Sequence, residues 1–274
     1  MEKSVRQAVA FIRSRYDEPI TLSQLAAEVF VSPYHFSRIF SRAVGMTPGR
    51  YLTAVRLFAA KRMLLTTDLT VSDIVCSVGY NSVGTFTSRF TRAVGVSPTQ
   101  YRSPAVSRLL VAVSHDFSRL PALGEMIEAR RRRPDSPVSG TTITGVLDVP
   151  ESVGHSDVMV GVFREAAPQG SPVAFEALSA HGRTEYTVSG VPYGSHHVIA
   201  VARPRGSEGE SAPVLTASTR RHVRTAPGLN TFVGLSMGPA NETAPPLAVT
   251  LAETASVQTR EPGPGLAGLR QTVA

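Results

Sequence analysis

Cysteine and long hydrophobic runs are almost missing from this sequence. Cys76 is the only cysteine among the 274 residues, so no disulfide can form within the chain, as is typical of proteins in a reducing cytosol. Its apolar neighbours favour a small buried side chain over a redox sensor. The longest apolar stretches, such as residues 109–113, are far too short to span a bilayer. No apolar signal segment is visible at the start, and the sequence predicts a cytoplasmic protein without a membrane partner.

Recognisable catalytic and metal-binding motifs are also missing. The sequence contains no G-x-S-x-G nucleophile elbow, no phosphate-binding loop and no dinucleotide-binding fingerprint. His155, His181 and His222 lie far apart without metal-ligand spacing, and His196 and His197 are adjacent on an expected strand, where they point to opposite faces. We therefore expect no enzyme activity, no metal and no cofactor.

Acidic residues are scarce in the first part of the chain. Residues 1–102 contain 13 Lys and Arg against 6 Asp and Glu, whereas the remainder contains 15 of each, so the net charge of +7 lies on the first part. A compact basic domain beside a neutral one is typical of a protein that binds a polyanion. A solvated surface with no partner would carry the same charge, and the choice between the two depends on the motifs.

The first hundred residues contain an internal repeat. Residues 36–52 read FSRIFSRAVGMTPGRYL, and residues 86–102 read FTSRFTRAVGVSPTQYR. Upstream, Thr-Leu-Ser at residues 21–23 corresponds to Thr-Val-Ser at residues 70–72. An internal repeat defines the structural unit. Here the unit is a short helix, a turn and a second helix, present twice.

Helix start and stop signals divide this part into about seven helices. Thr21 to Gln24 fit the capping-box pattern, and Thr70 to Asp73 cap the second copy. Three further starts carry an N-cap residue followed by proline, namely Ser32-Pro33, Thr47-Pro48 and Ser97-Pro98. Ser82 caps the second helix of the second copy, and Gly79 forms the turn before it. Residues 48–65 are predicted to form one long amphipathic helix.

These features resemble the DNA-binding region of AraC/XylS-type transcription regulators. The resemblance rests on the duplicated units, on the F-x-R-x-F pattern at residues 36–40, on a G-x-[ST]-P-x-x-Y segment after each copy and on Gly79-Tyr80. It covers residues 1–102 nearly end to end. It implies two recognition helices that enter successive major-groove segments on one face of double-stranded DNA, joined by the rigid helix at residues 48–65.

The resemblance also implies which side chains face the DNA. The base-facing candidates are Tyr34, Ser37 and Arg38 in the first copy and Gly84, Thr85, Ser88 and Arg89 in the second. The phosphate-contact candidates are Ser32, Arg42, Ser82 and Arg92. For Arg42 and Arg92 a repeated structural ion pair is an equal alternative, and for Arg38 the alternative is a surface ion pair.

The second copy departs from the family pattern. The family usually has an arginine where Ser88 stands, and here the arginine is displaced to Arg89, about 100° further around the helix. Gly84 offers no side chain. We therefore expect the first copy to read bases strongly and the second copy to hold mainly the backbone.

From residue 141 the sequence changes to short Val- and Thr-rich runs separated by Gly, Pro and Ser. Strands are expected at residues 142–147, 158–163, 173–178, 186–188 and 198–201, with further strands near 230–237 and 247–251. This pattern is typical of a β-sandwich. Residues 182–202, GRTEYTVSGVPYGSHHVIAVA, resemble a signature of transthyretin-like and carboxypeptidase-regulatory-like β-sandwiches. We interpret that segment as a hairpin with its turn at residues 191–194.

The predicted fold class is multidomain α + β. It consists of an all-α double helix-turn-helix at residues 1–103, a linker at 104–140, an all-β sandwich at 141–252 and a disordered tail at 253–274. The linker contains a short helix near residues 123–129 and the basic run 130–133, which we expect to be solvated rather than bound to phosphate.

The predicted function is sequence-specific DNA binding by a transcription regulator. The alternative is a ligand-binding or protein-interaction β-sandwich protein whose basic helical domain is a scaffold. In the family the effector or dimerisation domain usually precedes the DNA-binding part, so no sugar-binding role is inferred for the residues that follow it here. A small-molecule effector, self-association and docking of transcription proteins such as RNA polymerase stay open for the second domain.

Overall fold

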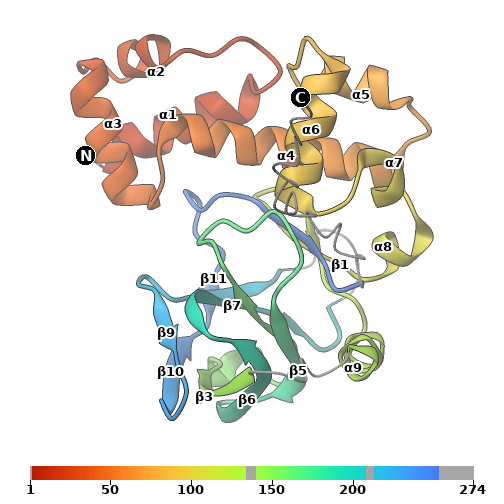
Figure 1. Cartoon of the computed structure of the whole chain (residues 1–274). Coiled ribbons are helices and arrows are strands. Elements are labelled where there is room, and N and C mark those ends of the chain that lie inside the picture. Colours follow the sequence, from red (N-terminus) through yellow and green to blue (C-terminus); the bar gives the residue numbers. More distant parts are fainter. Residues whose placement is uncertain (1, 134–139, 208–212, 253–274) are drawn as a thin grey trace, which may run out of the picture.

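The computed structural model describes residues 2–133, 140–207 and 213–252. The chain folds into a helical part and a strand-rich part that lie against each other (Figure 1). The predicted disordered tail at residues 253–274 lies outside the described residues.

Eight helices form the described part of the chain before the first strand. They are α1 (Glu2–Ser14), α2 (Leu22–Glu28), α3 (Pro33–Val44), α4 (Pro48–Thr66), α5 (Val71–Ser77), α6 (Val83–Val94), α7 (Pro98–Tyr101) and α8 (Pro104–Arg108). The predicted N-caps are confirmed, because the hydroxyls of Thr21, Ser32, Thr47, Thr70, Ser82 and Ser97 each accept the backbone N–H three residues later. Such caps satisfy N–H groups that lack a partner within the helix.

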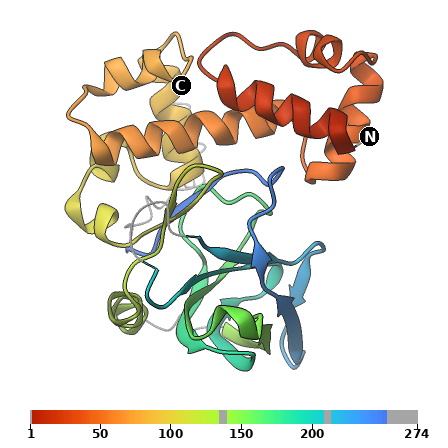
Figure 2. The ribbon, with the colours of Figure 1, turned by 180° about the vertical axis from the view of Figure 1, so that it is seen from behind.

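The helical part has two separate cores that share one helix. The first core is formed by α1, α2, α3 and the start of α4, where Tyr51 and Val55 contribute. The second core is formed by the end of α4 with α5, α6 and α7, and Leu57 and Leu64 contribute there. The predicted long helix therefore joins two packed units, and Figure 2 shows it running beneath both.

The prediction that the Cys76 side chain is buried is wrong, because the side chain is exposed. Ile74 and Val75 bury the inward face of α5, which leaves the following residue on the outward face. The apolar neighbours of this cysteine therefore did not indicate its own burial.

The described residues of the strand-rich part form three sheets. The strands are β1 (Leu110–Val113), β2 (Ser118–Arg119), β3 (Gly140–Asp148), β4 (Ser156–Phe163), β5 (Ala174–Ala180), β6 (Arg183–Pro192), β7 (Gly194–Pro204), β8 (Leu215–Ser218), β9 (Val223–Thr225), β10 (Thr231–Ser236), β11 (Gly238–Pro239) and β12 (Leu247–Thr250). They pair in the orders β12-β1-β2, β10-β3-β6 and β11-β8-β7-β4-β5, with β9 paired to β7. The seven predicted strands are confirmed.

The six-stranded sheet is covered on both faces. One face shares an apolar core with the β10-β3-β6 sheet, in which Ile143 and Val188 pack with Val160 and Ala200. The other face is covered by β1, β12 and α9 (Leu123–Arg132), in a second core. The six-stranded sheet and the β10-β3-β6 sheet thus form two packed layers, which explains the alternating apolar and polar residues in the sequence.

The predicted hairpin within residues 182–202 is wrong. β6 pairs with β3, whereas β7 pairs with β4, β8 and β9, so the two strands lie in different sheets. Residues 196–202 of β7 are all buried, while β6 alternates between exposed and buried positions. A strand that is buried on both faces takes a central place in a covered sheet, and the chain crosses between sheets at Tyr193.

The segment predicted as a linker is built into the fold. β1 pairs with β12, with Leu110 opposite Thr250, and α9 packs against β5. The short helix near residues 123–129 is confirmed as α9. Its basic run is solvated only in part: Arg131 and Arg132 are exposed, as predicted, whereas Arg133 donates to the carbonyl of Pro172 over 2.7 Å. Pairing with a strand more than a hundred residues away explains why the local sequence did not indicate this.

α4 contacts the strand-rich part at β1, at β12 and at the segment between β4 and β5. The buried Lys61 donates to the carbonyl oxygens of Gln169 and Ala248, over 2.6 and 2.8 Å. A Cβ placed on Gly170 would lie 3.2 Å from the carbonyl oxygens of Ala93 and Val94 at the end of α6. In the first unit, the hydroxyl of Tyr51 donates to the carbonyl of Ala244 over 3.2 Å, so the strand-rich part touches both helix-turn-helix units.

Candidate nucleic-acid interface

The second helix of each unit, α3 or α6, is held by the same aromatic arrangement. Phe40 packs edge-on against Tyr51 with ring centroids 5.6 Å apart, and Phe90 packs edge-on against Tyr101 at 5.4 Å. All four side chains are fully buried. Because the apolar face of each helix is anchored, its opposite face points outward.

The base-facing candidates lie on those outward faces. Tyr34, Arg38, Gly84, Thr85, Ser88 and Arg89 are exposed, and Ser37 is partly exposed. The exposed fraction of Tyr34 is 74%, which is high for an aromatic side chain. The geometry therefore leaves every one of these positions accessible to a groove, and base contact itself stays a prediction.

Arg38 stacks on Tyr34 instead of pairing with an acid. Its guanidinium carbon lies 5.7 Å from the centre of the Tyr34 ring, within the range of a cation–π interaction. Among the described residues no carboxylate lies within ion-pair distance of Arg38. The stacking pre-orients the donors of the guanidinium without occupying them.

The repeated arginines Arg42 and Arg92 are exposed in the last turn of α3 and of α6. Within the part of the chain that the structure describes, neither makes an ion pair. Duplication of a structural ion pair therefore does not explain their recurrence. Their charges suit the negative end of the helix dipole and remain available to an anion.

Ser32 and Ser82 use their oxygens as N-caps. Ser32 accepts the backbone N–H of His35 over 3.3 Å, and Ser82 accepts that of Thr85 over the same distance. A hydroxyl that accepts one bond can still donate its own hydrogen. Both groups can therefore hold the helix start and also donate to a phosphate.

The second copy differs from the first at the positions of Ser88 and Arg89. Arg89 is exposed, whereas its counterpart Ile39 is only 8% exposed. Burial lowers the pKa of Arg56 on α4, and the nearby positive charge of Arg89 adds to the lowering. Arg89 therefore takes the helix position of the nearly buried Ile39, and not the position that Arg38 takes in the first copy.

Sequence reasoning missed the role of Arg56. Its guanidinium donates to the carbonyl oxygens of Tyr16 and Glu18 over 2.6 and 2.7 Å, and it lies over the ring of Tyr80. It ties the α1–α2 segment to α4 and to the turn of the second unit. Nothing in its local sequence distinguishes it from the other arginines of α4.

The turn before α3 contains a residue that sequence reasoning also passed over. Phe30 is 93% exposed and adopts a left-handed φ of 56°. The corresponding turn of the second copy has Gly79, with φ of 76°. A comparison of the two copies at these turns would have indicated the unusual phenylalanine.

Four histidines of the strand-rich part lie in two pairs. The rings of His155 and His181 stack at 4.8 Å, and those of His197 and His222 lie 4.4 Å apart. Burial lowers the pKa of His197. Across the described residues no cluster of three or more His, Cys, Asp or Glu side chains could hold a metal ion. No described helix is long and apolar enough to cross a membrane.

Two capped and exposed second helices, joined by one shared helix, define a double helix-turn-helix. Residues 25–103 match the family described as "Helix-turn-helix domain". With the relatives described next, this identifies the N-terminal part of the chain as an AraC-type helix-turn-helix domain.

The chain is similar over this part to several transcription regulators. The lactose operon transcription activator of Staphylococcus xylosus is 31% identical over 102 residues, which are 37% of this chain and 37% of that protein. The HTH-type transcriptional regulator Rv1931c of Mycobacterium tuberculosis is 43% identical over 81 residues, 30% of this chain and 31% of that protein. The melibiose operon regulatory protein of Escherichia coli is 34% identical over 104 residues, which are 38% of this chain and 34% of that protein. The chain thus spans about a third of the length of these relatives.

Solved structures match over the same share of the chain. The DNA-binding domain of AdpA, in complex with a target DNA, is 30% identical and covers 36% of this chain and 88% of its own, with a TM-score of 0.35. The C-terminal domain of AraT from Geobacillus stearothermophilus is 35% identical, with a TM-score of 0.35. The match covers 36% of this chain and 83% of the AraT domain.

Proposed function

We propose that this protein is a sequence-specific DNA-binding transcription regulator. Its two recognition helices, α3 and α6, enter successive major-groove segments on one face of the duplex. The observation that carries the proposal is the mounting of two outward-facing, N-capped helices on opposite ends of the single helix α4. A major groove admits an α-helix and presents a distinct pattern of donors and acceptors for each base pair.

We assign base reading mainly to the first unit. Arg38 donates to a guanine, with Tyr34 and Ser37 beside it, while Gly84, Thr85, Ser88 and Arg89 form the weaker reader of the second unit. The support is that Arg38 is exposed and already oriented by Tyr34. Arginine bound bidentately to guanine is the commonest specific contact in the major groove.

We assign backbone contacts to Ser32, Arg42, Ser82 and Arg92. These residues occupy matching positions at the start and end of the two recognition helices. Phosphate contacts position a protein on the duplex without reading its sequence, and the basic balance of residues 1–102 suits that role.

We propose that residues 1–103 are the DNA-binding domain and that a second domain of the β-sandwich class begins at residue 110 and extends to residue 252. Residues 110–133 belong with the second domain, because strand β1 pairs with β12, whereas α8 before them places Val106 in the second core of the helical part. The second domain serves regulation rather than catalysis, through an effector, self-association or docking of RNA polymerase. One relative, AdaA of Bacillus subtilis, is named a bifunctional transcriptional activator and DNA repair enzyme and is 34% identical over 92 residues. We do not propose a repair activity for this chain. We propose that the protein acts in the cytoplasm.

Selection of bound sites from a random duplex library by the full chain tests the proposal. A recovered consensus with two blocks one helical turn apart, about 10 base pairs, is the expected result. The binding constant of the selected duplex is then compared with that of a scrambled duplex as salt is raised.

The alternative, a scaffold role for the helical domain, predicts no affinity for any duplex even at low salt. That result would refute DNA binding. Equal affinity for the selected and scrambled duplexes would leave a DNA-binding protein without sequence specificity.

A further inference from the structure

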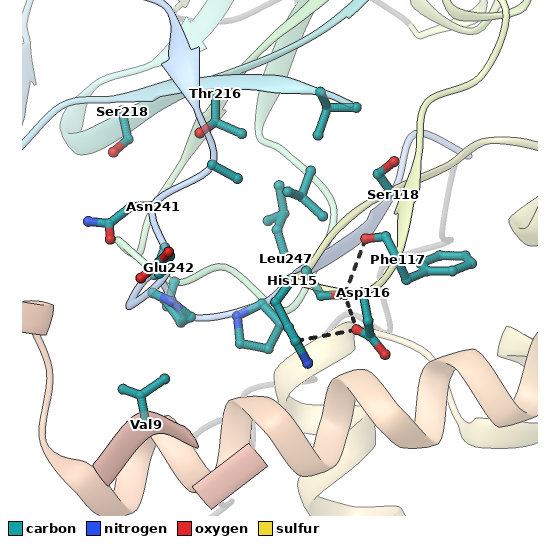
Figure 3. Close-up of a pocket in the computed structure, with 18 of the residues that line it drawn as sticks. Val9, His115, Asp116, Phe117, Ser118, Thr216, Ser218, Asn241, Glu242 and Leu247 are labelled. Atoms are coloured by element: carbon teal, nitrogen blue, oxygen red, sulfur yellow. Dashed lines mark hydrogen bonds and ion pairs between the residues drawn. The ribbon is translucent and has the colours of Figure 1, made fainter. Parts of the chain in front are cut away.

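A cavity of about 870 Å³ separates α1 of the helical part from the strand-rich part. Its walls come from α1, from the turn between β1 and β2, from β7 and β8, and from residues 240–247. Figure 3 shows Val9 on α1 across the cavity from Thr216 and Ser218 on β8. This volume lies in the range of pockets that enclose a small organic molecule.

The interior of the cavity is largely apolar. Val113, Ile199, Val214 and Leu247 belong to the core beneath the six-stranded sheet and also line the cavity. Phe117 lines it from the β1–β2 turn. Apolar surface of this extent favours a ligand with an apolar body, because burial of that body removes both surfaces from water.

Two arginines face the cavity from one stripe of α1. Arg6 and Arg13 are seven residues apart, which is about two helical turns, and Val9 and Ala10 lie between them. Arg13 donates to the carbonyl of Ala244 over 3.1 Å. A guanidinium has five N–H donors, so most donors of Arg13 are left for other acceptors.

Among the described residues no carboxylate forms an ion pair with Arg13. Arg6 pairs with Glu2 at 3.6 Å and with Glu242 at 3.9 Å, and these two side chains are 82% and 78% exposed. Asp116 is engaged elsewhere, since it accepts from Ser114 over 2.8 Å and from Arg62 over 3.2 Å. Arg13 therefore keeps its positive charge for a ligand in the cavity, and an anion at Arg6 would compete only with exposed carboxylates.

On the opposite wall, β8 contributes two hydroxyls. Thr216 and Ser218 are two residues apart on one strand, so their side chains lie on the same face, and both line the cavity. They can donate to or accept from a polar substituent of a ligand.

We propose that this cavity binds a small organic anion with an apolar body, such as an aromatic carboxylate or sulfonate. The anionic group lies between Arg6 and Arg13, and the apolar body lies against Val113, Ile199 and Val214. The proposal does not depend on DNA binding by the helical part. Because one wall is α1 and the others are strands and turns of the strand-rich part, the ligand contacts both parts of the chain at once.

The test uses two dyes of similar shape with the full chain. 8-Anilinonaphthalene-1-sulfonate carries the anionic group, and N-phenyl-1-naphthylamine lacks it. We expect saturable binding of one sulfonate per chain and weaker binding of the neutral dye. The double substitution Arg6→Gln and Arg13→Gln should weaken sulfonate binding by at least about tenfold, because it removes charge-assisted hydrogen bonds. It should leave the neutral dye unaffected.

Two further variants separate the cavity from a general effect of charge or folding. Arg15→Gln removes an arginine of the segment after α1 that does not line the cavity, and it should bind like the unaltered chain. Ala10→Phe places a ring in the cavity from an exposed helix position and should abolish binding of both dyes. Circular dichroism checks that each variant is folded. No saturable sulfonate binding, or sulfonate binding that survives Ala10→Phe or the double arginine substitution, would overturn the proposal.

Discussion

The ammonium group of Lys61 on α4 donates a hydrogen bond to the carbonyl oxygen of Ala248 on β12, over 2.8 Å. The side chain is completely buried, and its other acceptors are the backbone and side-chain oxygens of Gln169. All three acceptors are neutral. Burial without an acid partner lowers the pKa of Lys61 to about 7, so the contact between the two parts contains a charge that is costly near neutral pH.

This lysine makes stability depend on pH. In the unfolded chain its pKa returns to the ordinary value of 10.5, so between about pH 7 and that value the unfolded state binds more protons. The free energy of unfolding therefore rises with pH in this window, by up to about 1.4 kcal/mol per pH unit. Urea unfolding at pH 7, 8 and 9 measures the rise, and Lys61→Met should remove it. Parallel pH profiles for the two proteins would contradict the assignment.

Arg38 should matter more for sequence reading than its counterpart Ser88. Arg38→Ala should weaken binding to the selected duplex by roughly 1–3 kcal/mol and relax one base position, because a bidentate contact with guanine is lost. Ser88→Ala should leave the base preferences nearly unchanged. Fluorescence anisotropy with single-base variants of the selected duplex makes the measurement. Equal losses of specificity in the two variants would refute the asymmetry between the copies.

Arg42 and Arg92 should contribute affinity without specificity. Arg42→Gln and Arg92→Gln should each weaken binding to selected and scrambled duplexes alike. Each should also reduce the slope of log K against log salt by about 1, because one fewer counterion is released. Arg15→Gln is the matched control, since this arginine already pairs with Glu18. A loss confined to the selected duplex would show base reading instead.

The turn at Phe30 should gain stability from glycine. Its left-handed φ of 56° costs a residue with a Cβ about 1–2 kcal/mol, and its exposed ring loses little burial. Glycine also raises the conformational entropy of the unfolded chain, which offsets part of the stabilisation. Phe30→Gly should therefore raise the free energy of unfolding by about 0.5–1 kcal/mol, measured in urea.

The reverse change in the second copy, from glycine to alanine, should lower stability. A Cβ at Gly79 would lie 2.5 Å from the carbonyl oxygen of Asp17, and φ is left-handed there too. Gly79→Ala should lower the free energy of unfolding by more than about 1 kcal/mol. If both substitutions changed the free energy of unfolding in the same direction, strain of a Cβ at a left-handed φ would not explain the two turns.

Much of the helical part could be predicted, because its signals are local. Thr21 and Gln24, or Ser32 and His35, lie three residues apart, and their hydrogen bonds form wherever the helix begins. The outward faces of α3 and α6 followed from the buried phenylalanines at helical spacing. The stacking of Arg38 on Tyr34 was not foreseen, although the two residues lie one helical turn apart on α3.

Partners that are distant in the chain could not be predicted in the same way. β7 was recognised as a strand, yet its neighbours are β4, β8 and β9 and not the preceding strand β6. β1 was assigned to a linker because four apolar residues have no local sign of a strand partner at residues 247–250. Strand pairing is selected by burial of both faces, which depends on the whole domain.

The amino-acid sequence by itself determined the repeat, the helix ends, the positions of most strands and the basic character of residues 1–102, since each depends on side chains a few residues apart or on composition. Only the tertiary structure decided that Lys61 is buried between the two parts and that Arg6 and Arg13 line a cavity against β8. Those environments are made by segments more than a hundred residues away. The cost of burying a charge, and the shape of a cavity, depend on the packed neighbours and not on the chain next to the residue.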